Sequence, residues 1–234
     1  MKLFAALLIL TISTMSLRGE QKTISDRVAE FSDAVQARLV PSFVAAGVAY
    51  PPTKITMVAI KQERRLELYA AGDDDDFRFV RAFPILAASG ELGPKLKEGD
   101  RQVPEGIYRI RELNPNSLYH LSLWLDYPND FDQARASEDG RTELGSEIMI
   151  HGSDQSRGCL AMGDEAAEDL FVLSALTGIE NVTAIVAPVD FRQRPFDLPK
   201  GAPVWTSELY QQIAKSLAPY RVTEAAASAL TSPF

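Results

Sequence analysis

The sequence is poor in the residues that build metal centres and disulfide bonds. Its 234 residues include one cysteine, Cys159, and two histidines, His120 and His151. One cysteine cannot close an internal disulfide, and three such ligands fall short of the four that hold a structural zinc ion. We therefore expect a fold that forms without metal or disulfide bonds.

Positive charge is scarce as well. The chain has 24 lysine and arginine residues against 32 aspartate and glutamate residues, a net charge of −8, and no long basic stretch. Binding to nucleic acid or to an anionic membrane depends on clustered Lys and Arg, so the sequence argues against both functions. Hydrophobic residues make up 46% and charged residues 24%, which is ordinary for a globular protein.

The sequence lacks an apolar run long enough for a confident transmembrane helix. Its most apolar stretch, residues 3–17, follows Met1 and Lys2 and has the length and positive start of a signal peptide. We predict a signal peptide over residues 1–19, cut after Ser16 or Gly19, with an uncleaved anchor as the alternative. In either case the rest of the chain is expected to reach the periplasm.

The hydrophobic pattern predicts a β-rich domain with helices at its margins. Strands are expected at residues 54–60, 65–70, 77–85, 107–111, 119–125, 147–151 and 182–189. Helices are expected at residues 24–40, 164–176 and 207–217, the first ended by Pro41 and the second by Gly178. The strands are connected locally, which favours antiparallel pairing, so we expect a mainly β fold with flanking helices (α+β).

No internal repeat or linker divides the chain, so the predicted organisation is one domain with flanks. Its parts are the signal peptide (1–19), a helical N-terminal segment (20–50), the β-rich domain (51–190), and a C-terminal helix with a loose tail (191–234).

The segment from residue 150 to 162 contains both Cys159 and His151. A thiol becomes a strong nucleophile when it loses its proton, an imidazole can accept that proton, and the charge of Arg157 favours the thiolate. The backbone N–H groups of Gly158 and Cys159 can face a developing oxyanion. The segment thus predicts an activated thiol with a lowered pKa; a buried cysteine that acts as a small hydrophobe is the alternative.

Several separated motifs resemble one enzyme family. His151-Gly152, followed by Ser156-Arg157-Gly158-Cys159, resembles the His-Gly … Ser-x-Gly-Cys signature of the YkuD-type L,D-transpeptidases, exported bacterial enzymes that remodel peptidoglycan. Residues 99–108 (GDRQVPEGIY) resemble that family's Gly-Asp … Thr-Pro-Glu-Gly strand entry. Three further stretches are similar to the YafK-like branch of the family: residues 89–95 (SGELGPK), 119–122 (YHLS) and 127–129 (YPN). The resemblance covers roughly residues 54–190 and implies a β-sandwich-like catalytic domain.

The resemblance assigns roles to the residues that match the signature. It implies that Cys159 is the nucleophile and His151 the proton acceptor. Gly152 and Ser153 follow this histidine, where a backbone carbonyl orients the imidazole, and Gly158 is the glycine beside the nucleophile.

Two positions depart from the family pattern. Arg157 replaces a histidine found in many members, and we expect it either to hold a substrate carboxylate or to be a loop cation in solvent; Val103 replaces the usual threonine. His120 is expected either to line the substrate pocket or to be a structural histidine. Ser156 is expected to shape the loop beside the substrate, and Tyr119 to form the core or the wall of the cleft.

The activity that the resemblance implies is acyl transfer on peptidoglycan stem peptides, without metal or organic cofactor. The Cys159 thiolate would attack the carbonyl at the L-centre of diaminopimelate and form a thioester. The acceptor stays open: a second stem, a protein lysine, or water. The YafK-like details favour water and the release of an envelope lipoprotein anchored to peptidoglycan. The competing hypotheses are a non-catalytic peptidoglycan-binding domain and, ranked lower, a thiol-redox protein, because no Cys-x-x-Cys pair is present.

Overall fold

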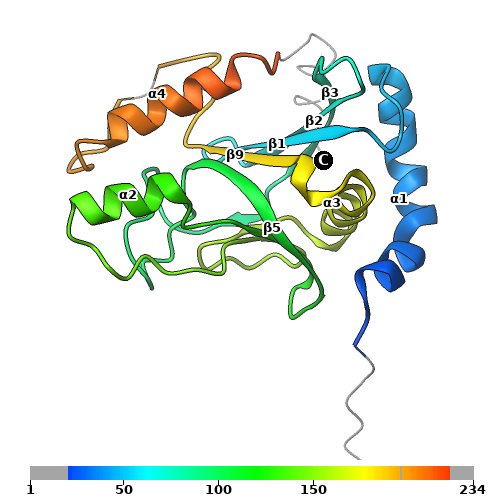
Figure 1. Ribbon diagram of the computed structural model, residues 1–234, viewed down its shortest axis with the longest axis horizontal. Helices are drawn as coiled ribbons and strands as arrows, with labels where there is room; N and C mark the ends of the chain where they lie inside the picture. The colour runs from blue at the N-terminus through cyan, green and yellow to red at the C-terminus, as the bar shows by residue number, and fades with distance from the viewer. Residues whose placement is uncertain (1–20, 196, 222–234) are drawn as a thin grey trace, which may run out of the picture.

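A single nine-stranded sheet with helices packed on both of its faces forms the core of the protein (Figure 1). The computed structural model describes residues 21–195 and 197–221, so the predicted signal peptide (1–19) and tail (223–234) lie outside the described residues. The strands are β1 (Lys54–Ile60), β2 (Arg65–Ala71), β3 (Arg78–Pro84), β4 (Ala87–Ala88), β5 (Gly106–Ser117), β6 (His120–Leu125), β7 (Met149–His151), β8 (Leu160–Ala161) and β9 (Val182–Ala187). The helices are α1 (Ile24–Ala46), α2 (Asp130–Glu138), α3 (Asp164–Thr177) and α4 (Thr206–Leu217), with a short 3-10 helix, η1 (Ile179–Asn181). The predicted α+β class is confirmed.

The strand order explains how the site is assembled. The order is β3-β2-β1-β9-β5-β6-β7-β8-β4, and the 12-residue β5 pairs with both β9 and β6, which joins the two halves of the sheet. Six of the eight neighbouring pairs are antiparallel, as expected, while β1/β9 and β7/β8 are parallel. Parallel pairing of β7 and β8 requires the intervening loop, residues 152–159, to bring the chain back to the start of β7.

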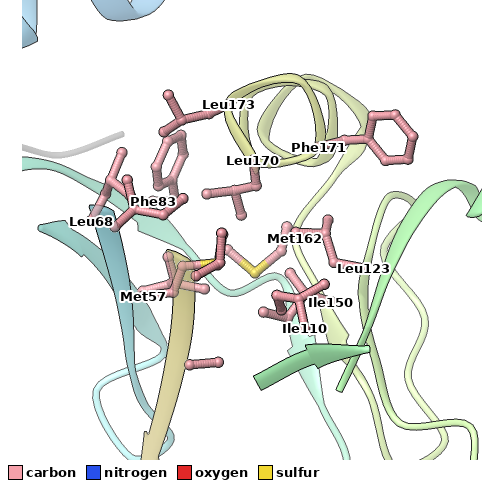
Figure 2. Packing of buried hydrophobic residues seen from close by; sticks show 14 of the residues in the cluster. Met57, Leu68, Phe83, Ile110, Leu123, Ile150, Met162, Leu170, Phe171 and Leu173 are labelled. Carbon is pink, nitrogen blue, oxygen red and sulfur yellow. The ribbon is translucent and has the colours of Figure 1, made fainter. Parts of the chain in front are cut away.

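Both faces of the central strand β1 are buried, which explains why Ile55 and residues 57–60 are all apolar and do not alternate with exposed polar residues. Met57 belongs to the cluster under α1 and α3, whereas the next residue, Val58, packs with α4 on the other face. Figure 2 shows Leu170 of α3 pointing toward Met162 and the strands below it. Burying a side chain of this size stabilises the fold by about 1.5–3 kcal/mol.

Two predicted elements had the wrong limits, and one helix was not predicted. Pro41 does not end the first helix, because α1 continues through it to place Phe43 in the core beside Val35 and Leu39, and Thr23 caps its start. The strand predicted at 107–111 is the longer β5, since its pairing with β6 continues to Ser117. The polar segment after residue 127 contains α2, which was not predicted.

The remaining predicted elements agree with the structure. β1 has the predicted limits, and α3 starts at Asp164 and ends before Gly178 as expected. No helix in the described ranges combines the length and apolar character needed to cross a membrane.

Candidate active site

Cys159 and His151 are brought together by the parallel pair β7/β8. His151 ends β7 opposite Ala161, and Cys159 stands immediately before β8. Residues two apart on a strand face the same side, so Cys159 shares the face of Ala161 and of His151. Both side chains are buried, and both line one cavity of about 430 Å³.

The imidazole of His151 is fixed in one tautomer. Its Nδ1 lies 2.5 Å from the carbonyl oxygen of Gly152, and a carbonyl can only accept, so Nδ1 carries the hydrogen. Nε2 therefore keeps the lone pair that can take a proton. The ring also stacks on Tyr119, with 4.5 Å between the ring centroids and 28° between the planes. Burial lowers the pKa of His151 below its ordinary value, against the opposing effect of the hydrogen bond to Gly152.

Gly152 is required because the β5–β6 turn lies directly against it. A Cβ at this position would come within 2.5 Å of Asp164 Oδ1 and 2.7 Å of the Tyr119 carbonyl oxygen. Asp164 also accepts from the Ser153 N–H at 2.8 Å, which fixes the turn after His151. The contact that brings Tyr119 onto the imidazole thus depends on the absence of a side chain at 152.

The thiol of Cys159 is not activated in the way the sequence suggested. Its Sγ donates to the carbonyl oxygen of Glu147 at 3.5 Å. Burial raises its pKa, as does the charge of Glu147, while a hydrogen bond from the Met149 backbone and the charge of Lys95 act in the opposite direction. The predicted lowering of the pKa is therefore wrong, because desolvation of the thiolate outweighs the nearby positive charge.

Two serines fix the loop that carries Cys159. Ser89 Oγ accepts from the Gly158 N–H at 2.6 Å, and Ser156 Oγ donates to the Cys159 carbonyl at 2.6 Å. Ser89 N in turn donates to Ser156 Oγ at 3.0 Å. The expectation that the Gly158 N–H faces an oxyanion is wrong in this structure, because Ser89 occupies it. Sequence reasoning missed Ser89, although it begins the stretch 89–95 that resembled the family.

His120 lies outside the cavity, which favours its structural alternative. Its Nε2 is 3.0 Å from Glu168 Oε1 on α3, and its ring packs edge-on against Phe31 of α1, 5.4 Å between centroids. Ser153 also lies outside, since it lines a separate cavity at the start of α3. These two residues position the turns around His151 and do not face the thiol.

Two charged side chains line the cavity with Cys159. They are Arg157, which the sequence singled out, and Glu147, which it did not. Both are exposed. Glu147 was missed because no motif marks it; its position beside the thiol follows from the turn before β7, where its φ is 58°.

The arrangement suits general-base activation of a neutral thiol. With the pKa of His151 lowered and that of Cys159 raised, both groups are uncharged near neutral pH. His151 Nε2 can then accept the thiol proton as Cys159 attacks an acyl carbon. Among the described residues, no group of three or more His, Cys, Asp or Glu is arranged to hold a metal ion.

A cysteine and an oriented histidine that line one cavity form the arrangement that a thiol nucleophile and an imidazole base require. The sequence profile of the YkuD family, the L,D-transpeptidase catalytic domain, matches residues 53–190. This range contains the whole sheet and both site residues, and the chain belongs to that family.

The chain is also similar to individual proteins. It is 34% identical over 113 residues to YafK of Escherichia coli (strain K12), which is named as an L,D-transpeptidase; YafK of Escherichia coli O157:H7 aligns equally well. The alignment covers 47% of this chain and 43% of that protein, so the chain matches less than half of the relative's length.

Among solved structures, the helical cell shape determining protein Pgp2 of Campylobacter jejuni superposes with a TM-score of 0.47 at 22% identity, covering 58% of this chain and 48% of that one. L,D-transpeptidase 1 of Mycobacterium tuberculosis superposes with a TM-score of 0.34 at 14% identity, covering 57% and 62%.

Proposed function

We propose that the protein is a cysteine acyl-transfer enzyme acting on peptidoglycan stem peptides. The observation that carries the proposal is that Cys159 and His151 line one cavity, with the His151 Nδ1 hydrogen held by Gly152 so that Nε2 is the free base. Family membership supplies the substrate class.

The proposed reaction has two steps. Cys159 Sγ attacks the carbonyl carbon at the L-centre of diaminopimelate while its proton passes to His151 Nε2. The C–N bond then breaks, the same proton goes to the departing amine, and a thioester remains on Cys159. An incoming amine or water attacks the thioester and restores the thiol.

The acceptor decides among three possible activities. An amine from a second stem gives a cross-link, a protein lysine gives anchoring, and water gives a hydrolase that releases an anchored protein. We favour the hydrolase because residues 89–95, 119–122 and 127–129 resemble the YafK-like branch of the family, and that branch resembles enzymes that release an anchored lipoprotein. We also propose that the enzyme works in the periplasm, on the basis of the apolar residues 3–17 that follow Lys2.

Mass spectrometry of peptidoglycan fragments tests the proposal. Sacculi are incubated with the wild-type protein and, in parallel, with the Cys159→Ala variant. New dimers joined between two diaminopimelate residues, absent with the variant, identify a transpeptidase. Loss of an attached protein or of a stem bond without new dimers identifies a hydrolase. Identical fragment profiles with both proteins would contradict catalysis and favour a peptidoglycan-binding domain.

A further inference from the structure

Two opposite charges stand at the entry of the two strands that carry the catalytic residues. β7 and β8 pair in parallel with a constant offset of ten residues, Ile150 opposite Leu160 and His151 opposite Ala161. Met149 and Cys159 stand immediately before these paired positions, and Glu147 and Arg157 each lie two residues further back in their own segments. A carboxylate and a guanidinium therefore line the same cavity as the thiol.

Both charges are available to a ligand. Glu147 and Arg157 are exposed and line the same cavity of about 430 Å³ as Cys159. Among the described residues, neither side chain forms an ion pair or a hydrogen bond, with the other or with any third residue. The other charge that acts on the thiol, Lys95, is instead paired with Asp100 at 2.5 Å.

The backbone holds Glu147 close to the reaction. Its carbonyl oxygen accepts a hydrogen bond from the Cys159 thiol at 3.5 Å. Its backbone φ of 58° is a conformation that residues other than glycine rarely adopt. Such backbone outliers concentrate at functional sites.

We propose that Glu147 and Arg157 form a zwitterion-binding pair that selects stems whose third residue ends in a free amino-acid head group. This inference rests on the proposed function, because that head group is the D-centre of the diaminopimelate whose L-centre Cys159 attacks. The Glu147 carboxylate accepts hydrogen bonds from the ammonium, and the Arg157 guanidinium donates to the carboxylate. A lysine stem offers only the ammonium and leaves Arg157 without a partner.

Four tetrapeptide stems separate the two contacts. One carries meso-diaminopimelate, one has its side-chain carboxylate amidated, one has its side-chain amine acetylated, and one carries lysine. Binding is measured by calorimetry in the Cys159→Ala background, so that the result does not depend on turnover. Into this background Glu147→Gln, Arg157→Gln and Arg157→Lys are introduced, with Asp33→Asn and Arg64→Gln as matched charge controls on the exposed surface away from the cavity.

The pair predicts a crossed pattern of affinities. Glu147→Gln should weaken binding of the diaminopimelate stem about tenfold or more but should add no loss for the acetylated stem. Arg157→Gln should also weaken binding of the unmodified diaminopimelate stem about tenfold or more but should add no loss for the amidated or lysine stems. Arg157→Lys should bind the unmodified stem more tightly than Arg157→Gln does. The two control variants should bind as the parent does.

Any of three results would overturn the pair. The first is an equal loss for all four stems, which would indicate a general effect of the variant on the site. The second is unchanged affinity in both variants, and the third is an equal loss in the surface controls. Turnover of the four stems by the enzyme with Cys159 intact is measured separately: absence of turnover together with the crossed pattern would reject the proposed chemistry and retain the recognition.

Discussion

Replacing Ser89 with alanine tests whether this distant serine holds the nucleophile loop. Its Oγ accepts from the Gly158 N–H at 2.6 Å and donates to the Arg101 carbonyl at 2.7 Å. Gly158 is buried, so Ser89→Ala leaves a donor without water or partner. Leaving such a group unsatisfied costs about 1–3 kcal/mol. The thermal midpoint should fall by roughly 2–4 °C for each kcal/mol lost in a chain of this size.

The same change should also expose the thiol. Because Ser89 fixes Gly158 next to Cys159, the freed loop should let iodoacetamide reach the Cys159 Sγ faster than in the wild type at the same pH. Ser32→Ala is the matched control: Ser32 Oγ donates only to the Val28 carbonyl within α1, so stability should change by no more than about 0.5 kcal/mol. A Ser89→Ala protein with the wild-type melting temperature and alkylation rate would refute the role of this serine.

Three further predictions concern the catalytic pair. Gly152→Ala should destabilise the fold by about 1–3 kcal/mol and lower kcat/KM at least tenfold, because the added Cβ displaces the Tyr119 carbonyl. Urea unfolding measures the first effect and steady-state kinetics the second. Unchanged kinetics would count against a role for the contact between Gly152 and Tyr119. Glu147→Gln should move the alkylation profile of Cys159 to lower pH, because the Glu147 charge raises the pKa of that thiol; a profile unchanged or moved upward contradicts this. In the wild type, burial lowers the pKa of His151, so kcat/KM should fall on the acid side only below the ordinary imidazole pKa of about 6.5. Burial raises the pKa of Cys159, so its alkylation rate should rise only above the ordinary thiol pKa of about 8.5. A thiolate that forms below pH 7 would contradict the neutral pair.

The meeting of Cys159 and His151 at one cavity could be predicted from sequence because a short contiguous segment contains both residues. The loop 152–159 joins two neighbouring strands, so the spacing of His151 and Cys159 already carries the geometry. The direction of the thiol pKa could not be predicted in the same way. It depends on how deeply the folded protein buries the thiol, which the local sequence does not show, and the nearby Arg157 suggested the opposite sign.

The misses in the fold have similar physical causes. Pro41 is a strong local stop signal, but packing of Phe43 in the core outweighs the lost backbone hydrogen bond. The helix α2 buries only Ala136, so it has no apolar stripe to reveal it, although its Asn129–Asp132 capping box was a usable signal. The contact of Ser89 with Gly158 spans 69 residues and exists only once β4 and β8 have paired.

Intact-protein mass spectrometry during turnover of a diaminopimelate stem tests the central claim most directly. The account predicts that the wild-type protein gains the mass of the acyl fragment, that digestion places this mass on Cys159, and that His151→Ala accumulates it far more slowly. Cys159→Ala should gain no mass and form no product. Formation of the same products by Cys159→Ala, or an acyl group on any other residue, would contradict the assignment of Cys159 as the nucleophile.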